Sequence, residues 1–309
     1  MKHLLLSDMN HKIKRLLDKS VLLIKLHLIN PFRRPRSRRH AMRIKYLHNY
    51  LKFYVSAADS VSSTTVCRDA EDKIFSIWLQ GEENAPEIIK ACFRSMRANF
   101  SQELVVLDSN TLQEYIDLPD FIMEKYRKGK ISHAHFSDIC RVELLHKYGG
   151  LWIDATCFAT GPIPQEIIDE DFLMTRTRPG DAFSYSFIQN CFIRARKGSW
   201  LLEAWRAMML EYWKHENKVA DYFVHQCLFE ALVTENPKAA MLFSQMPDIW
   251  QGYSHALWWG YADKPFDMEE FKRITGDFFF QKIGRKTKAA SQPLKGSFAE
   301  AMIKTSFSA

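Results

Sequence analysis

The stretch that decides the fold is SDICRVELLHKYGGLWIDATCF, residues 137–158. It predicts one helix, a glycine break and one strand. Ser137 suits the N-cap of the helix, and Asp138 follows in the first turn, where a carboxylate favours the helix dipole. Gly149 stands where a helix C-cap needs a residue that tolerates positive φ, and Gly150 completes the break.

The residues after the break alternate with period two, so they predict a short strand. Trp152, Asp154 and Thr156 fall on one face of it. An ionised carboxylate among apolar neighbours is costly unless it meets a cation, a metal or strong donors. In open α/β sheets, ligands bind outside the carboxyl ends of the strands. Asp154 is therefore a candidate binding residue.

The same stretch resembles the core motif of nucleotide-sugar glycosyltransferases of the GT-A fold, in the family of capsular polysaccharide synthesis proteins and DXD-containing mannosyl/galactosyltransferases. The residues that carry the resemblance are Ser137-Asp138-x-x-Arg141, Leu144-Leu145, Tyr148-Gly149-Gly150 and Trp152-x-Asp154-x-Thr156. The resemblance implies that Asp138 and Arg141 grip the donor sugar. It also implies that Asp154 is the first acid of the DXD element, which holds a divalent cation, Mn²⁺ or Mg²⁺. Thr156 replaces the second acid, and a hydroxyl is a weaker ligand for such a cation.

Asp138 and Arg141 lie one turn apart on the predicted helix, so they share a face. A carboxylate and a guanidinium fork supply an acceptor and rigid donors for sugar hydroxyls. The alternative is a surface ion pair, worth about 0.3–0.5 kcal/mol. The position of the pair before Tyr-Gly-Gly and an acid-bearing strand favours a binding site.

Other candidate donor-binding residues come from the resemblance. Ile77, Trp78 and Gln80 match the first-strand motif, where the strand end meets the nucleotide and an aromatic ring can stack on a base. A core tryptophan beside a turn glycine explains those residues as well. The remaining candidates near the donor are Tyr148, Gly149, Gly150, Trp152, Thr156 and Asn190. A single Asn190 inside a predicted strand can equally satisfy a backbone group.

Strand and helix patterns alternate along the chain, which predicts an α/β fold with a mostly parallel sheet and flanking helices. The predicted elements are strands over 73–79, 104–107 and 186–193 and helices from 86, over 111–116, 121–128 and 200–213. With the resemblance, this implies a GT-A type, Rossmann-like nucleotide-sugar-binding domain. We expect a basic helical arm over 1–54, a linker over 55–72 and the catalytic domain over 73–309.

The arm carries most of the positive charge. Residues 1–54 hold 14 Lys and Arg against two acids, so the remainder of the chain is net negative although the whole chain carries +7. The arm therefore predicts peripheral attachment to an anionic membrane surface, where each basic residue adds about 1 kcal/mol. The alternative is a helical arm packed on its own domain or on a partner. Nothing downstream supports nucleic-acid binding.

Further sequence patterns exclude several classes of protein. The sequence contains no stretch of 18 uncharged apolar residues, which is the pattern that predicts a membrane span. The six cysteines form no CxxC pair. We therefore expect a cytoplasmic protein with reduced thiols, attached to the inner face of the membrane. No GxGxxG, P-loop, HExxH or GxSxG motif is present.

A late basic group, Lys282, Arg285, Lys286 and Lys288, suits a loop that closes over a diphosphate, and an exposed basic loop explains it as well.

The expected function is transfer of a sugar from a nucleotide-diphosphate sugar, UDP-sugar by the resemblance, to a growing cell-surface polysaccharide or lipid-linked glycan. The resemblance also implies retention of the anomeric configuration. One alternative is a catalytically silent, membrane-associated adaptor in a polysaccharide assembly complex, which Thr156 in place of an acid leaves open. A second alternative is a sugar-phosphate transferase.

Overall fold

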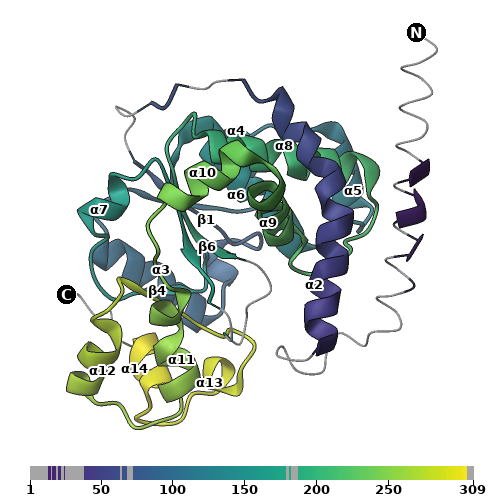
Figure 1. Cartoon of the computed structure of the whole chain (residues 1–309). Helices are drawn as coiled ribbons and strands as arrows, with labels where there is room; N and C mark the ends of the chain where they lie inside the picture. Colours follow the sequence, from purple (N-terminus) through teal and green to yellow (C-terminus); the bar gives the residue numbers. More distant parts are fainter. Residues whose placement is uncertain are drawn as a thin grey trace.

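The computed structural model describes residues 13, 14, 16–18, 20, 21, 24, 38–62, 65–67, 72–178, 181 and 187–304. In this part of the chain the strands form two sheets (Figure 1). The strands are β1 (Ile74–Ile77), β2 (Leu104–Leu107), β3 (Gly150–Ile153), β4 (Cys157–Ala159), β5 (Phe172–Arg176), β6 (Ile188–Ala195) and β7 (Phe280–Lys282).

The larger sheet has the strand order β2-β1-β3-β6-β5. Strand β1 is parallel to β2 and β3, whereas β6 is antiparallel to both β3 and β5. Four of these five strands therefore run in one direction, which confirms the predicted α/β fold with a mostly parallel sheet. The smaller sheet is the antiparallel pair β4-β7.

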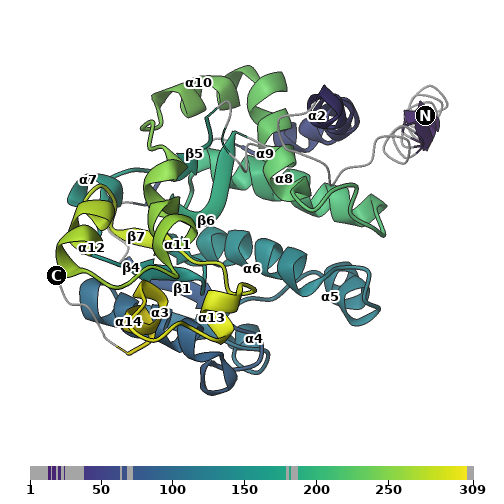
Figure 2. The same ribbon diagram turned by 90° about the horizontal axis from the view of Figure 1, so that it is seen from below.

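Helices surround the sheet. They are α2 (Arg38–Leu51), η1 (Lys52–Ser60), η2 (Glu82–Asn84), α3 (Glu87–Asn99), α4 (Leu112–Tyr115), α5 (Asp120–Arg127), α6 (His133–Tyr148), α7 (Gln165–Ile168), α8 (Trp200–His215), α9 (Val224–Glu235), α10 (Pro237–Gln245), η3 (Gln251–His255), α11 (Ala256–Tyr261), α12 (Met268–Thr275), α13 (Lys288–Ser291) and α14 (Phe298–Lys304). Helix α6 packs on β1 and β3, and α9 packs on β6. Helices α11–α14 gather at the end of the molecule away from α2 (Figures 1 and 2).

The central stretch differs from its prediction at both ends. Helix α6 begins at His133, and its N-cap is Ser132, whose hydroxyl accepts a hydrogen bond from the backbone N–H of His135. The prediction that Ser137 caps this helix was wrong, because an earlier serine precedes residues that continue the same helix. The predicted single strand is split: β3 ends at Ile153, a turn follows, and β4 then joins the other sheet.

The other predicted elements lie within a few residues of their expected places. Helix α3 follows Pro86 as expected, and it buries one apolar face: Ile88, Ile89, Cys92, Phe93 and Met96. Strand β2 has the predicted bounds, and α8 begins at Trp200 as expected. The periodic patterns of these segments were strong because each buries one face against the sheet or a neighbouring helix.

The segment from α2 to η1 packs on the domain. Tyr50 and Tyr54 are buried, and both donate hydrogen bonds to the carboxylate of Glu216, just after α8. Residues 52–60, the end of the expected arm and the start of the expected linker, are helical in η1 and contact α8 and α9. Most of residues 1–37, on which the membrane-surface prediction depends, lie outside the described residues.

Among the described residues, no helix is both long enough and apolar enough to cross a membrane. The six cysteines are all free thiols; Cys67 is exposed and the others are buried. This agrees with the predicted absence of disulfide bonds.

Gly150 has a positive φ of 94°. A Cβ at this position would lie 2.4 Å from the backbone oxygen of Lys73, because β3 and the chain before β1 approach closely there. We therefore expect Gly150→Ala to lower the free energy of unfolding by about 3 kcal/mol or more, through backbone strain and overpacking. Urea denaturation measures this change.

The matched control is Gly260→Ala in α11, where nothing lies within 4 Å of an added Cβ. It should leave stability unchanged or raise it by up to about 1 kcal/mol. Equal stability of the Gly150 variant and the wild type would contradict the close-approach interpretation.

Candidate functional site

The chain reversal at Gly149 brings the start of α6 back to the end of β3. The helical rise from Tyr148 back to Asp138 is about 15 Å, and the strand rise from Gly149 to Asp154 is about 16 Å. Asp138 and Asp154 therefore come level with each other at the carboxyl end of β3. Strand β1 runs parallel to β3 and ends at the same edge, which is where ligands bind in open α/β sheets.

Arg141 joins the two carboxylates. Its Nη2 lies 3.0 Å from Asp138 Oδ1 and 3.2 Å from Asp154 Oδ1. Its Nη1 donates a hydrogen bond of 2.6 Å to the backbone oxygen of Asn190 in β6. The guanidinium also stacks over the ring of Trp152, 4.8 Å from its centroid. Since the side chain is only 6% exposed, the pair with Asp138 is a buried ion pair and not the surface pair considered as an alternative.

The electrostatics keep both carboxyls ionised. Burial by itself raises the pKa of Asp138, but Arg141 and His225 more than offset it, so this pKa lies well below its ordinary value. Burial likewise raises the pKa of Asp154, and Lys282 and Arg141 reverse that effect. Burial lowers the pKa of Arg141, and the two carboxylates raise it to a net value above normal. The cluster is therefore a set of paired charges.

Side chains from β6 and α9 contact the carboxylate of Asp138. Asn190 Nδ2 donates to Asp138 Oδ1 at 3.0 Å, and Gln226 Nε2 donates to Asn190 Oδ1 at 3.0 Å. His225 Nδ1 lies 3.1 Å from Asp138 Oδ2. Because Trp213 Nε1 donates to His225 Nε2 at 3.0 Å, the neutral imidazole carries its proton on Nδ1, which faces Asp138. Burial keeps the pKa of His225 below its ordinary value.

Lys282, at the end of β7, lies on the other side of Asp154. Its Nζ donates to Asp154 Oδ2 at 2.5 Å and to Thr156 Oγ1 at 2.6 Å. Trp152 Nε1 donates to Asp154 Oδ1 at 2.8 Å. Asp154 Oδ1 therefore forms an ion pair with Arg141 and accepts a hydrogen bond from Trp152, and Oδ2 accepts a hydrogen bond from Lys282.

The residues around Asp154 do not fit the expected site for Mn²⁺ or Mg²⁺. Such an ion takes about six oxygen ligands in its first shell, whereas Asp154 and Thr156 offer one carboxylate and one hydroxyl that already hold an ammonium. A second cation, Arg141, contacts the same carboxylate. In the part of the chain that the structure describes, no three His, Cys, Asp or Glu side chains form a group that could hold a metal ion.

The first-strand candidates lie at the neighbouring strand end. Ile77 is buried as the last residue of β1, Trp78 follows it half-buried, and Gln80 is exposed. The guanidinium of Arg285 lies 5.5 Å from the ring centroid of Trp78. The stretch from Lys282, at the end of β7, to Arg285 thus contacts the residues that follow β3 and β1: Lys282 contacts Asp154, and Arg285 contacts Trp78.

Three candidates are not brought to this place. Tyr148, Gly149 and Gly150 lie at the opposite end of β3, where the chain leaves α6. The hydroxyl of Tyr148 donates to the backbone oxygen of Tyr115 at 2.9 Å, and the two glycines allow close backbone approach. The structure does bring together Asp138, Arg141, Trp152, Asp154, Thr156 and Asn190.

The contacts of His225, Gln226 and Lys282 were not predicted from the sequence. No contact between His225 or Gln226 and Asp138 was predicted, and Lys282 was only one member of the late basic group. The signal available for Lys282 was its place two residues after the apolar run 278–280, which is typical of a buried strand end.

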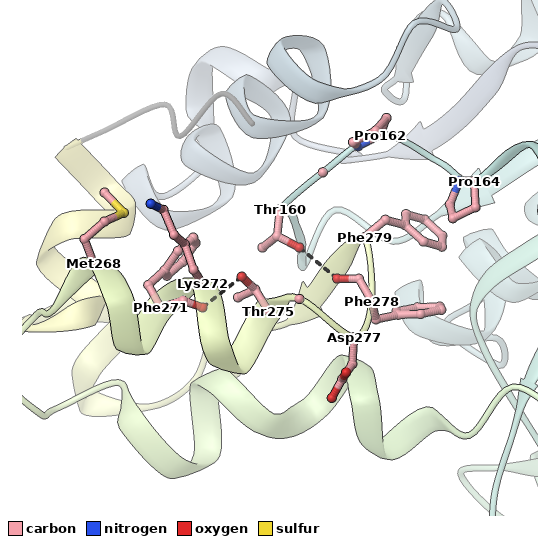
Figure 3. A pocket seen from close by; sticks show the side chains of 12 residues that line it. Thr160, Pro162, Pro164, Met268, Phe271, Lys272, Thr275, Asp277, Phe278 and Phe279 are labelled. Atoms are coloured by element: carbon pink, nitrogen blue, oxygen red, sulfur yellow. Dashed lines mark hydrogen bonds between the residues drawn. The ribbon is translucent and has the colours of Figure 1, made fainter.

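A cavity of about 520 Å³ lies elsewhere, between α12 and the segment that follows β4 (Figure 3). Its lining is mainly apolar, and its hydroxyls are bonded internally: Thr160 donates to the backbone oxygen of Phe278 at 3.0 Å, and Thr275 donates to that of Phe271 at 2.8 Å. None of the candidate residues line it. The candidate site is therefore the ionic cluster and not this cavity.

Replacing Arg141 by Met removes the buried cation between two carboxylates. We expect Arg141→Met to lower the free energy of unfolding by about 3–5 kcal/mol near neutral pH. In the wild type, the carboxyl groups of Asp138 and Asp154 have lower pKa values in the folded than in the unfolded protein, so their ionisation stabilises the fold at pH values above the unfolded pKa values. This stabilisation is lost as the pH falls through the pKa values of the folded protein. The difference in free energy of unfolding between Arg141→Met and the wild type should therefore be smaller in acid than near neutral pH. Urea denaturation under the two conditions measures it.

The matched control is Arg273→Met, which removes an exposed cation paired with Glu270 on α12 and should leave the unfolding midpoint nearly unchanged. A loss for Arg141→Met that is equally large in acid would contradict the pairing with ionised carboxylates.

Comparisons with known proteins find similar sequences among curated glycosyltransferases. The chain is 24% identical over 188 residues to the O-glycosyltransferase PaGT of Phomopsis amygdali, which covers 55% of this chain and 45% of that protein. It is 24% identical over 204 residues to the glycosyltransferase afumC of Aspergillus fumigatus (strain CBS 144.89 / FGSC A1163 / CEA10), which covers 58% of this chain and 51% of that protein. The chain thus spans about half the length of these curated relatives.

A solved structure, PaToxG Glycosyltransferase, superposes with a TM-score of 0.40 at 12% identity, over 86% of this chain and 98% of that one. A model of the family described as "Capsular polysaccharide synthesis protein" matches residues 26–301. Because that match spans most of the sequence, the chain belongs to the capsular polysaccharide synthesis protein family.

Proposed function

We propose that this protein is a glycosyltransferase that moves a sugar from a nucleotide-diphosphate sugar, a UDP-sugar, to a growing polysaccharide or lipid-linked glycan. The observation that carries the proposal is the buried ionic cluster of Asp138, Arg141 and Asp154 at the carboxyl edge of β1 and β3. Membership of the family and the names of the two relatives support it. We assign the catalytic domain, of the GT-A type, to residues 73–309, onto which the segment from α2 to η1 packs.

The reaction requires one bond to break and one to form. The bond between the sugar C1 and the diphosphate oxygen breaks, and its electron pair stays on the diphosphate. The acceptor oxygen bonds to C1, and its proton passes to solvent. The resemblance to the family adds retention of configuration to the proposal. The protein must therefore fix the sugar and stabilise the charge that develops on the leaving group.

The remaining hydrogen-bonding capacity of the cluster suits sugar hydroxyls. A carboxylate oxygen accepts about two hydrogen bonds. Asp138 Oδ1 already lies in an ion pair with Arg141 and accepts a hydrogen bond from Asn190, whereas Oδ2 faces His225. Asp138 Oδ2 and Asp154 Oδ2 therefore each retain room for one donor. In this proposal, Arg141 holds the two carboxylates in place, and the carboxylates accept from the sugar.

The nucleotide is proposed to lie over the end of β1. Trp78 offers an aromatic face there, and Arg285 supplies a cation beside that face. Gln80 is exposed two residues further along. A base on this strand end would place the diphosphate toward the neighbouring end of β3, next to Lys282.

The test is a screen of UDP- and GDP-sugars for nucleotide release by the full chain. We expect release of nucleoside diphosphate from one of the donors, because cleavage at C1 leaves both phosphates on the nucleotide. Arg141→Lys, which keeps the charge and loses the fork, should reduce that release at least about tenfold. Asp154→Asn, checked for folding by circular dichroism, should abolish it.

The outcomes separate the alternatives. Release of nucleoside monophosphate would identify a sugar-phosphate transferase. No release from any donor, together with no binding of UDP or GDP, would favour the adaptor and refute the proposal.

The attachment of residues 1–54 to an anionic membrane surface also stays a proposal. Leu47, Tyr50 and Leu51 belong to the buried core, so deleting the whole arm would damage the domain. Deleting residues 1–37 removes nine of the arm's 14 Lys and Arg and keeps α2. We expect this variant to lose binding to phosphatidylserine vesicles in a sedimentation assay and to retain nucleotide release.

Neutral phosphatidylcholine vesicles are the control, and they should bind neither form. Unchanged sedimentation of the shortened chain with anionic vesicles would place the attachment elsewhere.

A further inference from the structure

Lys282 is held in position by the backbone as well as by its ion pair. Strand β7 pairs antiparallel with β4, with Lys282 opposite Cys157 in the register. The backbone N–H of Ile283 donates to the oxygen of Thr156 at 2.9 Å. The pairing of β7 with β4 therefore places the Lys282 side chain next to the turn that carries Asp154 and Thr156. Its contact with them follows from strand pairing and not from a chance approach of a long side chain.

The ammonium occupies the position between the two side chains of the Asp-Ala-Thr element. It bonds Asp154 Oδ2 and Thr156 Oγ1 at the same time. A cation shared by the acidic element would have to contact these same two oxygens. A divalent ion there would meet Lys282 and, through the other oxygen of Asp154, Arg141, and repulsion between cations at such short distances is strong in a buried site.

Lys282 also remains able to bind an anion. An ammonium has three N–H donors, and two of them serve Asp154 and Thr156. Its side chain is 18% exposed, compared with 6% for Arg141. Burial lowers the pKa of Lys282, but Asp154 together with Cys157 and Cys191 raises it above its ordinary value, so the group stays protonated. Lys282 is thus the cation of the cluster that an incoming phosphate can reach.

We propose that Lys282 takes the place of the divalent cation: its ammonium, positioned by Asp154 and Thr156, donates its third N–H to the diphosphate of the leaving group. This inference rests on the proposed function and deepens it, since it makes the transfer independent of a metal. Electron density that stays on the diphosphate when the C1–O bond breaks is then stabilised by a fixed ammonium. Asp154 serves as the holder of Lys282.

The first test measures metal binding without reference to activity. Titration of the full chain with Mn²⁺, followed by electron paramagnetic resonance, should show no saturable binding, with or without UDP. UDP should bind equally well in the presence of chelator. Lys282→Met should weaken UDP binding at least about tenfold, whereas Lys272→Met, which removes an exposed lysine on α12, should change it little.

The second test uses the donor identified by the nucleotide-release screen. Wild-type release should change less than twofold on addition of chelator or Mn²⁺. Lys282→Met should reduce the release rate about 100-fold or more, the usual effect of removing one preorganised donor to a developing charge. Lys282→Asp, which adds a second carboxylate beside Asp154, should gain saturable Mn²⁺ binding if the variant folds, as circular dichroism would show.

The results separate this inference from the proposed function. Release that chelator abolishes and Mn²⁺ restores would overturn the role of Lys282 and leave glycosyl transfer standing. If no donor is turned over, UDP binding decides: binding that needs Mn²⁺ and is indifferent to Lys282→Met would overturn the inference, and metal-free binding that needs Lys282 would support it.

Discussion

The structure of the site depends on one buried guanidinium. Arg141 lies between Asp138 on its own helix and Asp154 at the end of β3, and it also reaches the backbone of β6. Without that cation, two carboxylates would face each other in a desolvated position, which costs several kcal/mol of stability. With it, α6, β3 and the more distant β6 are tied together at one edge of the sheet. The fork geometry of arginine is what allows one side chain to make all three contacts.

The second cation, Lys282, determines from which side an anionic ligand meets the cluster. Lys282 bonds the oxygen of Asp154 that Arg141 leaves open, and it comes from a different sheet, β4-β7. The polar cluster is therefore built where the two sheets meet at the turn after β3. An anionic ligand that approaches this turn meets the partly exposed ammonium before it meets the buried guanidinium. This order explains why we assign anion binding to Lys282 and a positioning role to Arg141.

The N-terminal segment is joined to the same framework. Tyr50 and Tyr54 bond the buried carboxylate of Glu216 at the end of α8, and α9, which carries His225 against Asp138, packs on α2 and η1. The end of the expected arm is thus part of the domain that carries the site. Charge density alone suggested a separable arm, because the lysines and arginines outnumber the acids there, while the buried tyrosines that attach it are spaced among them.

The sequence by itself determined the elements and the central acid–arginine arrangement. Periodicity predicted the strands and helices. Asp154 was identified from the strand pattern, and Asp138 and Arg141 from their shared helix face and the resemblance to the family motif, all within one contiguous stretch of the chain. Local patterns are reliable there because each face is set by neighbours a few residues away. The turn that splits the predicted strand after Ile153 escaped this reasoning, since β4 leaves to pair with β7 far along the chain.

Only the tertiary structure decided which charges meet. Lys282 is separated from Asp154 by 128 positions and His225 from Asp138 by 87, and no spacing rule connects residues so distant. The tertiary structure also keeps Tyr148, Gly149 and Gly150 away from the site, because they lie at the start of β3, whereas Asp154 follows its end. The pairing of strands across two sheets, and not the order of residues, selects the partners of a buried carboxylate, since only groups brought within hydrogen-bonding distance can offset its desolvation.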